Sequence, residues 1–242
     1  RPPLVCLHGF GSTKEDYADL AMRPEFDERS LIFWDAPGCG ASEVSAAQLL
    51  SIPFLVKVAL AACDALGVER FHLSGHSMGG LTALLLAHEH QNRVLSFMDI
   101  EGNIAPEDCF LSRQIIQHPG KTPAAFAEGF IDRVRHRTEL GSALYAAALP
   151  AKVQDTTFEP IFTSMVDLSD NTPLMDMFTG LPCPRAFIYG AQNSHLSYLG
   201  DLPSKGVDVI EIPQSGHFPM YSNPFALRTE MADFLEKQYA CQ

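Results

Sequence analysis

The 242-residue chain has few positive charges, no paired-cysteine motif and no long apolar run. Its 17 Lys and Arg are outnumbered by 29 Asp and Glu, which gives a net charge of −12. This balance argues against nucleic acid as a partner, because phosphate binding needs clustered cations. It argues equally against an anionic membrane surface. No run of about twenty apolar residues is available to span a bilayer, so we expect no membrane partner.

The six cysteines are scattered along the chain, at Cys6, Cys39, Cys63, Cys109, Cys183 and Cys241. No two form a CxxC pair, and their intervals match no zinc-ligand pattern. We therefore expect reduced, mostly buried thiols, no metal site and a cytoplasmic location. The chain opens directly on a strand-like segment with no signal peptide, and this abrupt start predicts further residues upstream that could carry a targeting signal.

The hydrophobic fraction of 46% is enough for a large core, and the length fits one domain with an inserted subdomain. Short apolar runs predict six strands, at residues 4–7, 31–34, 70–73, 94–100, 186–189 and 207–212. Helical patterns between and after them cover residues 45–66, 79–88 and 225–239. Buried strands that alternate with helices predict an α/β fold, with a mostly parallel sheet flanked by helices on both faces.

The alternation stops after the strand that ends near Ile100. Residues 103–182 contain no clear strand and are rich in Ala, Phe and Met. This stretch predicts a helical cap inserted into the sheet domain. The expected organisation is therefore a core of residues 1–102 and 183–242, with a cap of residues 103–182.

A G-x-S-x-G motif centred on Ser77 follows the third expected strand and precedes a helix. This strand–turn–helix context is what gives the motif its meaning, because the sharp turn lifts the serine hydroxyl above the sheet. Side chains at Gly75 or Gly79 would collide with neighbouring backbone. The turn also aims the N–H of Met78 at the space where an oxyanion develops. We expect Ser77 to be a nucleophile.

A second motif, Leu7-His-Gly-Phe-Gly-Ser12, follows the first expected strand. A His-Gly pair that leaves a strand can place a backbone N–H opposite Met78, and Phe10 is the expected second oxyanion donor. The Phe10 side chain is then free to line a pocket. We expect His8 to hold this loop by hydrogen bonds rather than to act as a base.

Four motifs in order, HGFGS, DAPGCGAS, GHSMGG and SGHFPMYSNP, resemble the α/β-hydrolase family. The resemblance covers nearly the whole chain except the helical insertion, which is similar to the family's cap. It implies the α/β-hydrolase fold and a serine hydrolase that needs no cofactor. It also implies that His217, on the loop after the last strand, is the base, because this family carries its histidine last in the chain.

The acid of the expected triad departs from the family pattern. The family usually carries it in the loop after the fifth strand, where this chain has Asn193. Three interpretations stay open. In the first, Asn193 itself orients His217 weakly. In the second, Asp201 reaches in from farther along the loop. In the third, the acid has moved to the end of the preceding strand, as in certain dehalogenases. We favour the last, with Glu101 as the acid and Asp99 two residues before it.

The expected substrate is a small or medium hydrophobic ester, cleaved through an acyl-enzyme. Aromatic side chains are candidates for its binding site, although packing of the cap would use the same side chains: Phe10, Trp34, Phe126, Phe130 and Phe162. Other chemistry on the same site stays open, namely C–C bond or lactone hydrolysis, perhydrolysis or a lyase reaction. Asn193 also keeps open a non-catalytic ligand receptor. The sequence also leaves open whether the chain forms a homodimer.

Overall fold

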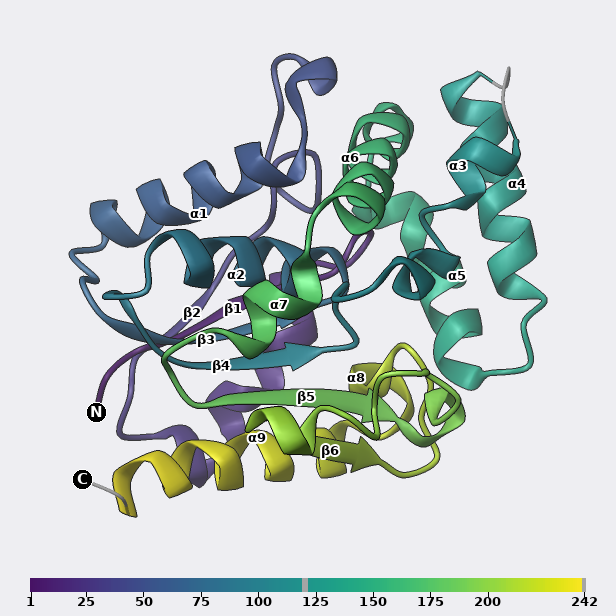
Figure 1. Ribbon diagram of the computed structural model, residues 1–242. Helices are drawn as coiled ribbons and strands as arrows, with labels where there is room; N and C mark the ends of the chain where they lie inside the picture. Colours follow the sequence, from purple (N-terminus) through teal and green to yellow (C-terminus); the bar gives the residue numbers. More distant parts are fainter. Residues whose placement is uncertain (119–121, 241–242) are drawn as a thin grey trace.

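The computed structural model describes residues 1–118 and 122–240, and their six strands form one parallel sheet in the order β2-β1-β3-β4-β5-β6 (Figure 1). The strands are β1 (Leu4–Leu7), β2 (Leu31–Phe33), β3 (Phe71–His76), β4 (Val94–Ile100), β5 (Arg185–Gly190) and β6 (Asp208–Ile212). Every neighbouring pair is parallel. The predicted α/β architecture is confirmed, and the sheet has the α/β-hydrolase arrangement.

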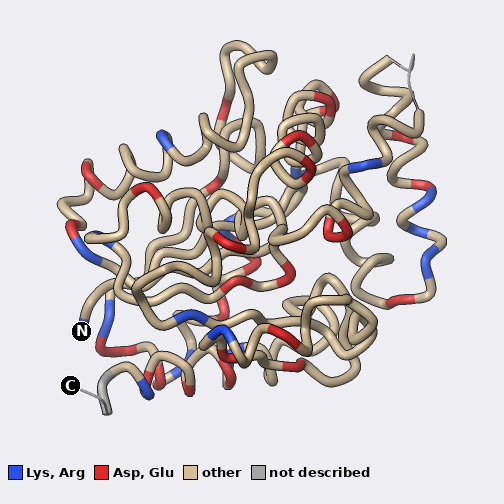
Figure 2. Tube along the Cα trace, in the orientation of Figure 1, with Lys and Arg blue, Asp and Glu red and all other residues tan. Residues whose placement is uncertain are grey.

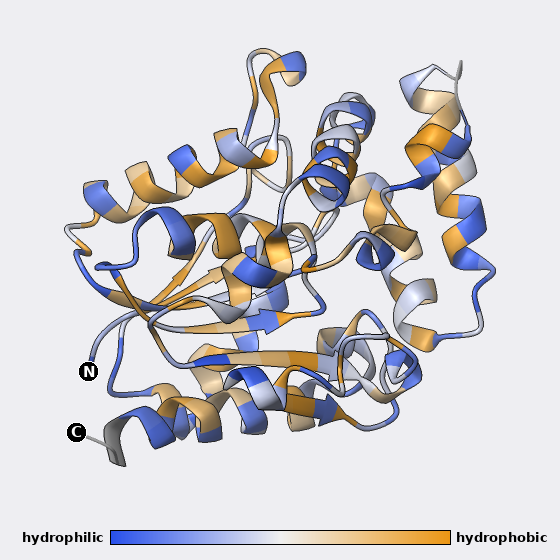
Figure 3. Ribbon diagram, in the orientation of Figure 1, coloured by the Kyte–Doolittle hydropathy of each residue, from blue (hydrophilic) through white to orange (hydrophobic). Residues whose placement is uncertain are grey.

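Helices cover both faces of this sheet. Figure 1 shows α1 (Ile52–Ala65), α2 (Met78–Glu89) and α7 (Leu174–Thr179) on one side and α9 (Pro224–Ala240) on the other. Because both faces are covered, much of the sheet is apolar, as the hydropathy colours show (Figure 3), although β3 and β4 also carry buried polar residues such as His72, Ser74 and Asp99. All six residues of β3 are buried. The nucleophile motif therefore projects from a strand that is buried along its whole length.

Helix α1 begins later than the sequence pattern predicts. We expected a helix from residue 45, but α1 starts at Ile52 and a short 3₁₀ turn, η3 (Ala47–Leu49), precedes it. Ser51 is the N-cap, and its side-chain oxygen accepts a hydrogen bond from the Phe54 N–H at 3.3 Å. Pro53 occupies the first turn, where its missing N–H has no cost. These two residues set the start of the helix.

The described residues between β4 and β5 form a series of helices joined by turns, with one isolated β-bridge at Val153. It contains η4 (Pro106–Phe110), α3 (Gln114–Gln117), α4 (Pro123–Arg135), α5 (Leu140–Lys152), η5 (Asp155–Thr157), α6 (Phe158–Asn171) and α7. In Figure 1, α3 to α6 gather beyond the arrowheads of β4 and β5. Helix α7 instead packs on the sheet domain, where Phe178 meets Phe97 edge-on at 5.8 Å. The expected cap boundaries at residues 103 and 182 stay a prediction.

An ion pair joins the end of α5 to the sheet domain. Lys152 Nζ lies 2.8 Å from Asp16 Oδ1, in the 3₁₀ helix η1 (Lys14–Met22), and the Tyr221 hydroxyl donates to the other oxygen at 2.8 Å. Tyr221 belongs to α8 (Pro219–Ser222). Burial alone would raise the pKa of Asp16, but the Lys152 hydrogen bond and charge lower it. The pair therefore links the helical insertion to both ends of the chain's core.

Three further 3₁₀ turns connect the larger elements: η2 (Pro24–Phe26), η6 (Ala191–Asn193) and η7 (Pro203–Lys205). Acidic and basic residues are interspersed along the chain trace rather than gathered into one basic stripe (Figure 2). Among the described residues, no helix combines the length and apolar character that crossing a membrane requires. Five cysteines are free thiols, and four of them are buried. Cys241 lies outside the described residues.

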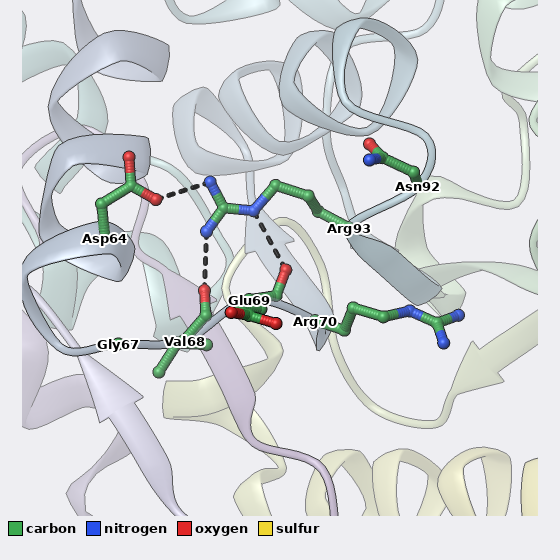
Figure 4. Close-up of a pocket in the computed structure, with 7 residues that line it drawn as sticks. All are labelled: Asp64, Gly67, Val68, Glu69, Arg70, Asn92 and Arg93. Carbon is green, nitrogen blue, oxygen red and sulfur yellow. Dashed lines mark hydrogen bonds and ion pairs between the residues drawn. The ribbon is translucent and has the colours of Figure 1, made fainter.

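A pocket of about 550 Å³ lies where β3 and β4 begin, at the opposite end of these strands from the nucleophile motif. The guanidinium of Arg93 fills one side of it (Figure 4). It donates to Asp64 Oδ1 at 2.7 Å, to the Val68 carbonyl at 2.6 Å and to the Glu69 carbonyl at 3.0 Å. These bonds fasten the turn before β3 to the start of β4, so the pocket is explained by structure alone.

Candidate active site

Ser77 occupies a sharp turn between β3 and α2. Its φ of 50° and ψ of −118° lie in a region that residues with a side chain rarely adopt. The Ser77 N–H donates to the Ile100 carbonyl at 3.0 Å, which holds this backbone in place. The surrounding fold therefore maintains a strained conformation that exposes the hydroxyl at the carboxyl end of the sheet.

The two motif glycines permit this turn. A Cβ on Gly75 would fall inside contact distance of the Gly79 carbonyl oxygen, and a Cβ on Gly79 would fall inside contact distance of the Leu7 carbonyl oxygen. Both obstacles are backbone atoms, which cannot rotate away. Glycine is therefore required at both positions for α2 to pack this closely against β1 and β3.

His217 lies on the loop after β6 and faces Ser77. Its Nε2 is 3.0 Å from Ser77 Oγ, and the residue is only 8% exposed. The ring of Phe110, from η4, meets the imidazole edge-on at 4.9 Å. Phe218 packs against it at the same separation. The imidazole is thus held within hydrogen-bond reach of the serine by packing on two sides.

His76 fixes the backbone of His217 from below. Its ring nitrogen Nε2 lies 2.7 Å from the His217 carbonyl oxygen, and the two rings are 5.0 Å apart. Burial, reinforced by the nearby His217, lowers the pKa of His76 to about 3. His76 is therefore neutral, and its Nε2–H is the donor. No motif predicts this contact, because the second position of G-x-S-x-G accepts many residues.

Glu101 follows β4 directly and approaches the other nitrogen of the imidazole. Its Oε2 is 3.4 Å from His217 Nδ1, a long separation of the kind often found in sites without substrate. The residue is 5% exposed and has a φ of 51°. Its backbone N–H donates to the Ile188 carbonyl at 2.9 Å. Ser77, His217 and Glu101 thus form one connected chain of side chains.

The other candidate acids have different surroundings. Asn193 does not face the imidazole in any described contact. Its Nδ2 instead donates to Glu101 Oε2 at 2.8 Å. Asp201 is exposed, and its described hydrogen bonds involve backbone atoms. Asp99 is fully buried beside Gly80 and Gly102, and burial raises its pKa well above the usual range.

The loop after β1 forms a tight turn beside the serine. The Ser12 N–H donates to the Gly9 carbonyl at 3.1 Å, which leaves Phe10 and Gly11 at the centre of the turn. Gly11 has a φ of 70°, where glycine is favoured. Opposite this turn, Met78 is the first residue of α2, where backbone N–H groups have no partner within the helix. The oxyanion roles of Phe10 and Met78 stay predictions.

His8 holds this loop, as its position in the sequence led us to expect. Its Nε2 accepts a hydrogen bond from the Ala36 N–H at 2.9 Å, and its Nδ1 lies 2.7 Å from the Gly9 carbonyl. Burial lowers the pKa of His8, so the ring is neutral. Gly9 itself must lack a side chain, because a Cβ there would lie 2.5 Å from His76 Nδ1.

An aromatic cluster from the helical insertion packs on Phe10. The Phe10 ring lies 4.7 Å from both Phe158 and Phe162. Phe126 and Phe130 complete the cluster through contacts with that pair. All five are buried. Trp34, another expected pocket residue, lies apart from them beside His8, at a ring separation of 6.4 Å.

No group of three or more His, Cys, Asp or Glu side chains could hold a metal ion among residues 1–118 and 122–240. The polar groups brought together at the carboxyl end of the sheet are those of the serine, histidine and glutamate, with Asn193 and His76 behind them. Phe110 and His76 were missed by the sequence analysis. No spacing signal marks either residue, because the fold alone brings them to His217.

A strained serine after a buried parallel strand, with a histidine on a late loop, defines the α/β-hydrolase class of fold. A family model for the alpha/beta hydrolase fold matches residues 2–155. The chain belongs to this family.

Two curated relatives illustrate its range. The chain is 27% identical to a 2-succinyl-6-hydroxy-2,4-cyclohexadiene-1-carboxylate synthase from Serratia proteamaculans, over 97% of this chain and 93% of the relative. It is 32% identical to a pimeloyl-[acyl-carrier protein] methyl ester esterase from Aeromonas hydrophila, over 52% of this chain and 45% of the relative. Matches to three further curated relatives span between 25% and 57% of their lengths.

Solved structures share the fold at low identity. A thermophilic esterase from Thermogutta terrifontis, with malate bound, superposes with a TM-score of 0.74 and 19% identity. The match covers 98% of this chain and 90% of that chain.

Proposed function

We propose that the protein is a cofactor-independent serine hydrolase that cleaves a small or medium hydrophobic ester. One observation carries this proposal: Ser77 Oγ lies 3.0 Å from His217 Nε2, while the far side of the same imidazole faces Glu101 at 3.4 Å. A nucleophile, a base and an orienting acid in this order are the requirement for acyl transfer. The roles follow from this geometry.

Acylation begins when Ser77 Oγ attacks the ester carbonyl carbon and His217 Nε2 takes the hydroxyl proton. The carbonyl oxygen becomes an oxyanion in front of the Met78 and Phe10 N–H groups. The Glu101 carboxylate balances the positive imidazolium. When the intermediate collapses, the bond to the alcohol oxygen breaks, and His217 returns the proton to that oxygen. The alcohol leaves, and the acyl group stays on Ser77.

Deacylation repeats these steps with water. His217 Nε2 removes a proton from water as the water oxygen attacks the acyl carbon. Collapse of the second oxyanion breaks the bond to Ser77 Oγ, which takes the proton back. The products are a carboxylic acid and the free enzyme, and no electron or cofactor is exchanged.

The aromatic surroundings support a hydrophobic substrate. Phe10 carries a proposed oxyanion donor on its backbone, and its side chain continues into the cluster with Phe158 and Phe162. Phe110 and Phe218 pack against the proposed base. An acyl chain that reached Ser77 would therefore lie near aromatic carbon, which favours a hydrophobic acyl group.

The test is hydrolysis of short p-nitrophenyl esters by the wild type and three variants. We expect Ser77→Ala to lose at least about 10⁴-fold in kcat, and Glu101→Gln to lose about 10²- to 10⁴-fold, because the imidazole loses its charged partner. Asp201→Asn is the matched control, because it removes an exposed carboxylate from the loop after β5. It should keep wild-type activity.

Two results would contradict the proposal. An active Ser77→Ala variant would remove the serine from the mechanism. A wild type that neither hydrolyses esters nor reacts with a fluorophosphonate probe would instead support a ligand-binding protein on the same fold. A Glu101→Gln variant with normal kcat would overturn the acid assignment alone.

A second candidate keeps the site but changes the reaction to lyase chemistry. It is favoured by the full-length similarity to a relative named as a synthase. In that case the Ser77–His217 pair would act as a base, with no acyl-enzyme. Parallel assays on ester, lactone and diketone panels separate the candidates, because only acyl transfer gives a burst of alcohol release before steady turnover.

A further inference from the structure

The side chain of Asn193 is bonded to the proposed acid rather than to the proposed base. Asn193 ends η6, one turn after β5, and its Nδ2 lies 2.8 Å from Glu101 Oε2. A carboxylate accepts hydrogen bonds, so the amide must present its NH₂ group. The same oxygen, Oε2, is the one that faces His217 Nδ1. Asn193 is thus one hydrogen bond away from the contact that orients the base.

A second donor from the same segment binds the other oxygen of the Glu101 carboxylate. The Gly190 N–H, at the end of β5, donates to Glu101 Oε1 at 2.7 Å. Both carboxylate oxygens are therefore held by donors from one short segment, residues 190–193. Glutamate has one more rotatable bond than aspartate, so its carboxylate needs such anchoring to stay directed at His217. Two charge-assisted hydrogen bonds provide it.

We propose that Asn193 is a positioning residue that fixes Glu101 against His217, and that positions 101 and 193 together accept only one negative charge. This inference rests on the proposed function. An aspartate at 193 would put a second carboxylate oxygen about 2.8 Å from Oε2, and two carboxylates so close cannot both be ionised. They would share a proton, which weakens the charge that faces the base. The amide supplies a donor where a second acid would compete.

Steady-state hydrolysis of a p-nitrophenyl ester tests both parts. We expect Asn193→Ala to lower kcat about 10-fold and Asn193→Asp about 100-fold, with KM unchanged, because the proposed role acts through Glu101 rather than on the ester. Gln192→Ala is the matched control from the same turn, and it should retain wild-type kcat.

The outcomes separate this inference from the proposed function. An Asn193→Ala variant with wild-type kcat would overturn the positioning role, and an Asn193→Asp variant with wild-type kcat would overturn the limit of one negative charge. For any variant that expresses poorly, the rate at which a fluorophosphonate labels Ser77 is the second measurement. The labelling rates should fall in the same order as the kcat values. If wild-type Ser77 resists the probe, the proposed function itself fails.

Discussion

The two ends of β3 and β4 contrast in how their polar groups and backbone are used. Where the strands begin, the Arg93 guanidinium donates hydrogen bonds to three acceptors (Figure 4). Where the strands end, Ser77 and Glu101 both have positive φ values, of 50° and 51°. Chemistry is expected where strain is maintained by the fold, and the carboxyl ends of parallel strands are where α/β folds place ligands.

The largest effect is expected when a glycine at the carboxyl end of the strands is replaced by alanine. Gly79→Ala places a methyl group against the Leu7 and His8 carbonyl oxygens, so we expect a loss of about 3 kcal/mol in the free energy of unfolding and at least about 100-fold in kcat/KM. Urea denaturation and ester hydrolysis measure the two effects.

Gly67→Ala is the control at the other end. Gly67 has a φ of 67°, and a Cβ there would meet nothing within 4 Å. The substitution should cost about 1 kcal/mol of stability from backbone strain alone and leave kcat/KM unchanged. Equal effects of the two alanines on activity would show that the elbow has no special backbone requirement.

Two histidines on β3 should make the free energy of unfolding depend on pH. Burial lowers the pKa of His72 to about 4, well below its unfolded value of about 6.5. The unfolded chain therefore binds the extra proton first, so the stability that this group contributes is complete above about pH 6.5 and is lost as the pH falls toward 4. The slope reaches about 1.4 kcal/mol per pH unit.

Urea denaturation between pH 4 and pH 7 measures this slope. His72→Asn should flatten it and leave kcat per folded molecule unchanged. His76→Asn should flatten it as well, because the pKa of His76 is lowered in the same direction, but it should also lower kcat through loss of the donor to the His217 carbonyl. An unchanged slope in both variants would refute this origin of acid sensitivity.

The smallest effect is expected from Arg93→Ala. The variant loses its hydrogen bonds to Asp64 and to the Val68 and Glu69 carbonyls, but these lie at a rim that water can reach. We expect a loss of about 1–2 kcal/mol in the free energy of unfolding, with kcat/KM within twofold of wild type. A tenfold fall in kcat/KM would mean that the two ends of the sheet are coupled.

The sequence predicts most of the sheet because buried parallel strands are short apolar runs, and all six were located within about three residues of their ends. The start of α1 was misplaced because its Ala- and Leu-rich pattern continues upstream of the real boundary. The capping pair Ser51 and Pro53 marks that boundary in the sequence, so better use of these residues would have found it.

The candidate site is predicted less completely, because motifs give positions along the chain but not directions of side chains. The place of Ser77 follows from its motif, and Glu101 is accessible to prediction because it directly follows a strand. The partner of Asn193 could not be foreseen: whether its amide faces the imidazole or the carboxylate depends on the turn of η6. The contacts of His76 and Phe110 depend likewise on packing between distant segments.

Ser77 and Glu101 both precede the helical insertion in the chain, whereas His217 follows it on the loop after β6. During translation, the strands that carry the first two residues leave the ribosome well before the third. Under the proposed mechanism, the nascent chain holds a serine without its base until the last strand has joined the edge of the sheet. Under this mechanism, the order of synthesis makes Ser77 the first of the pair to emerge, and it gains its base only after β6 has been made.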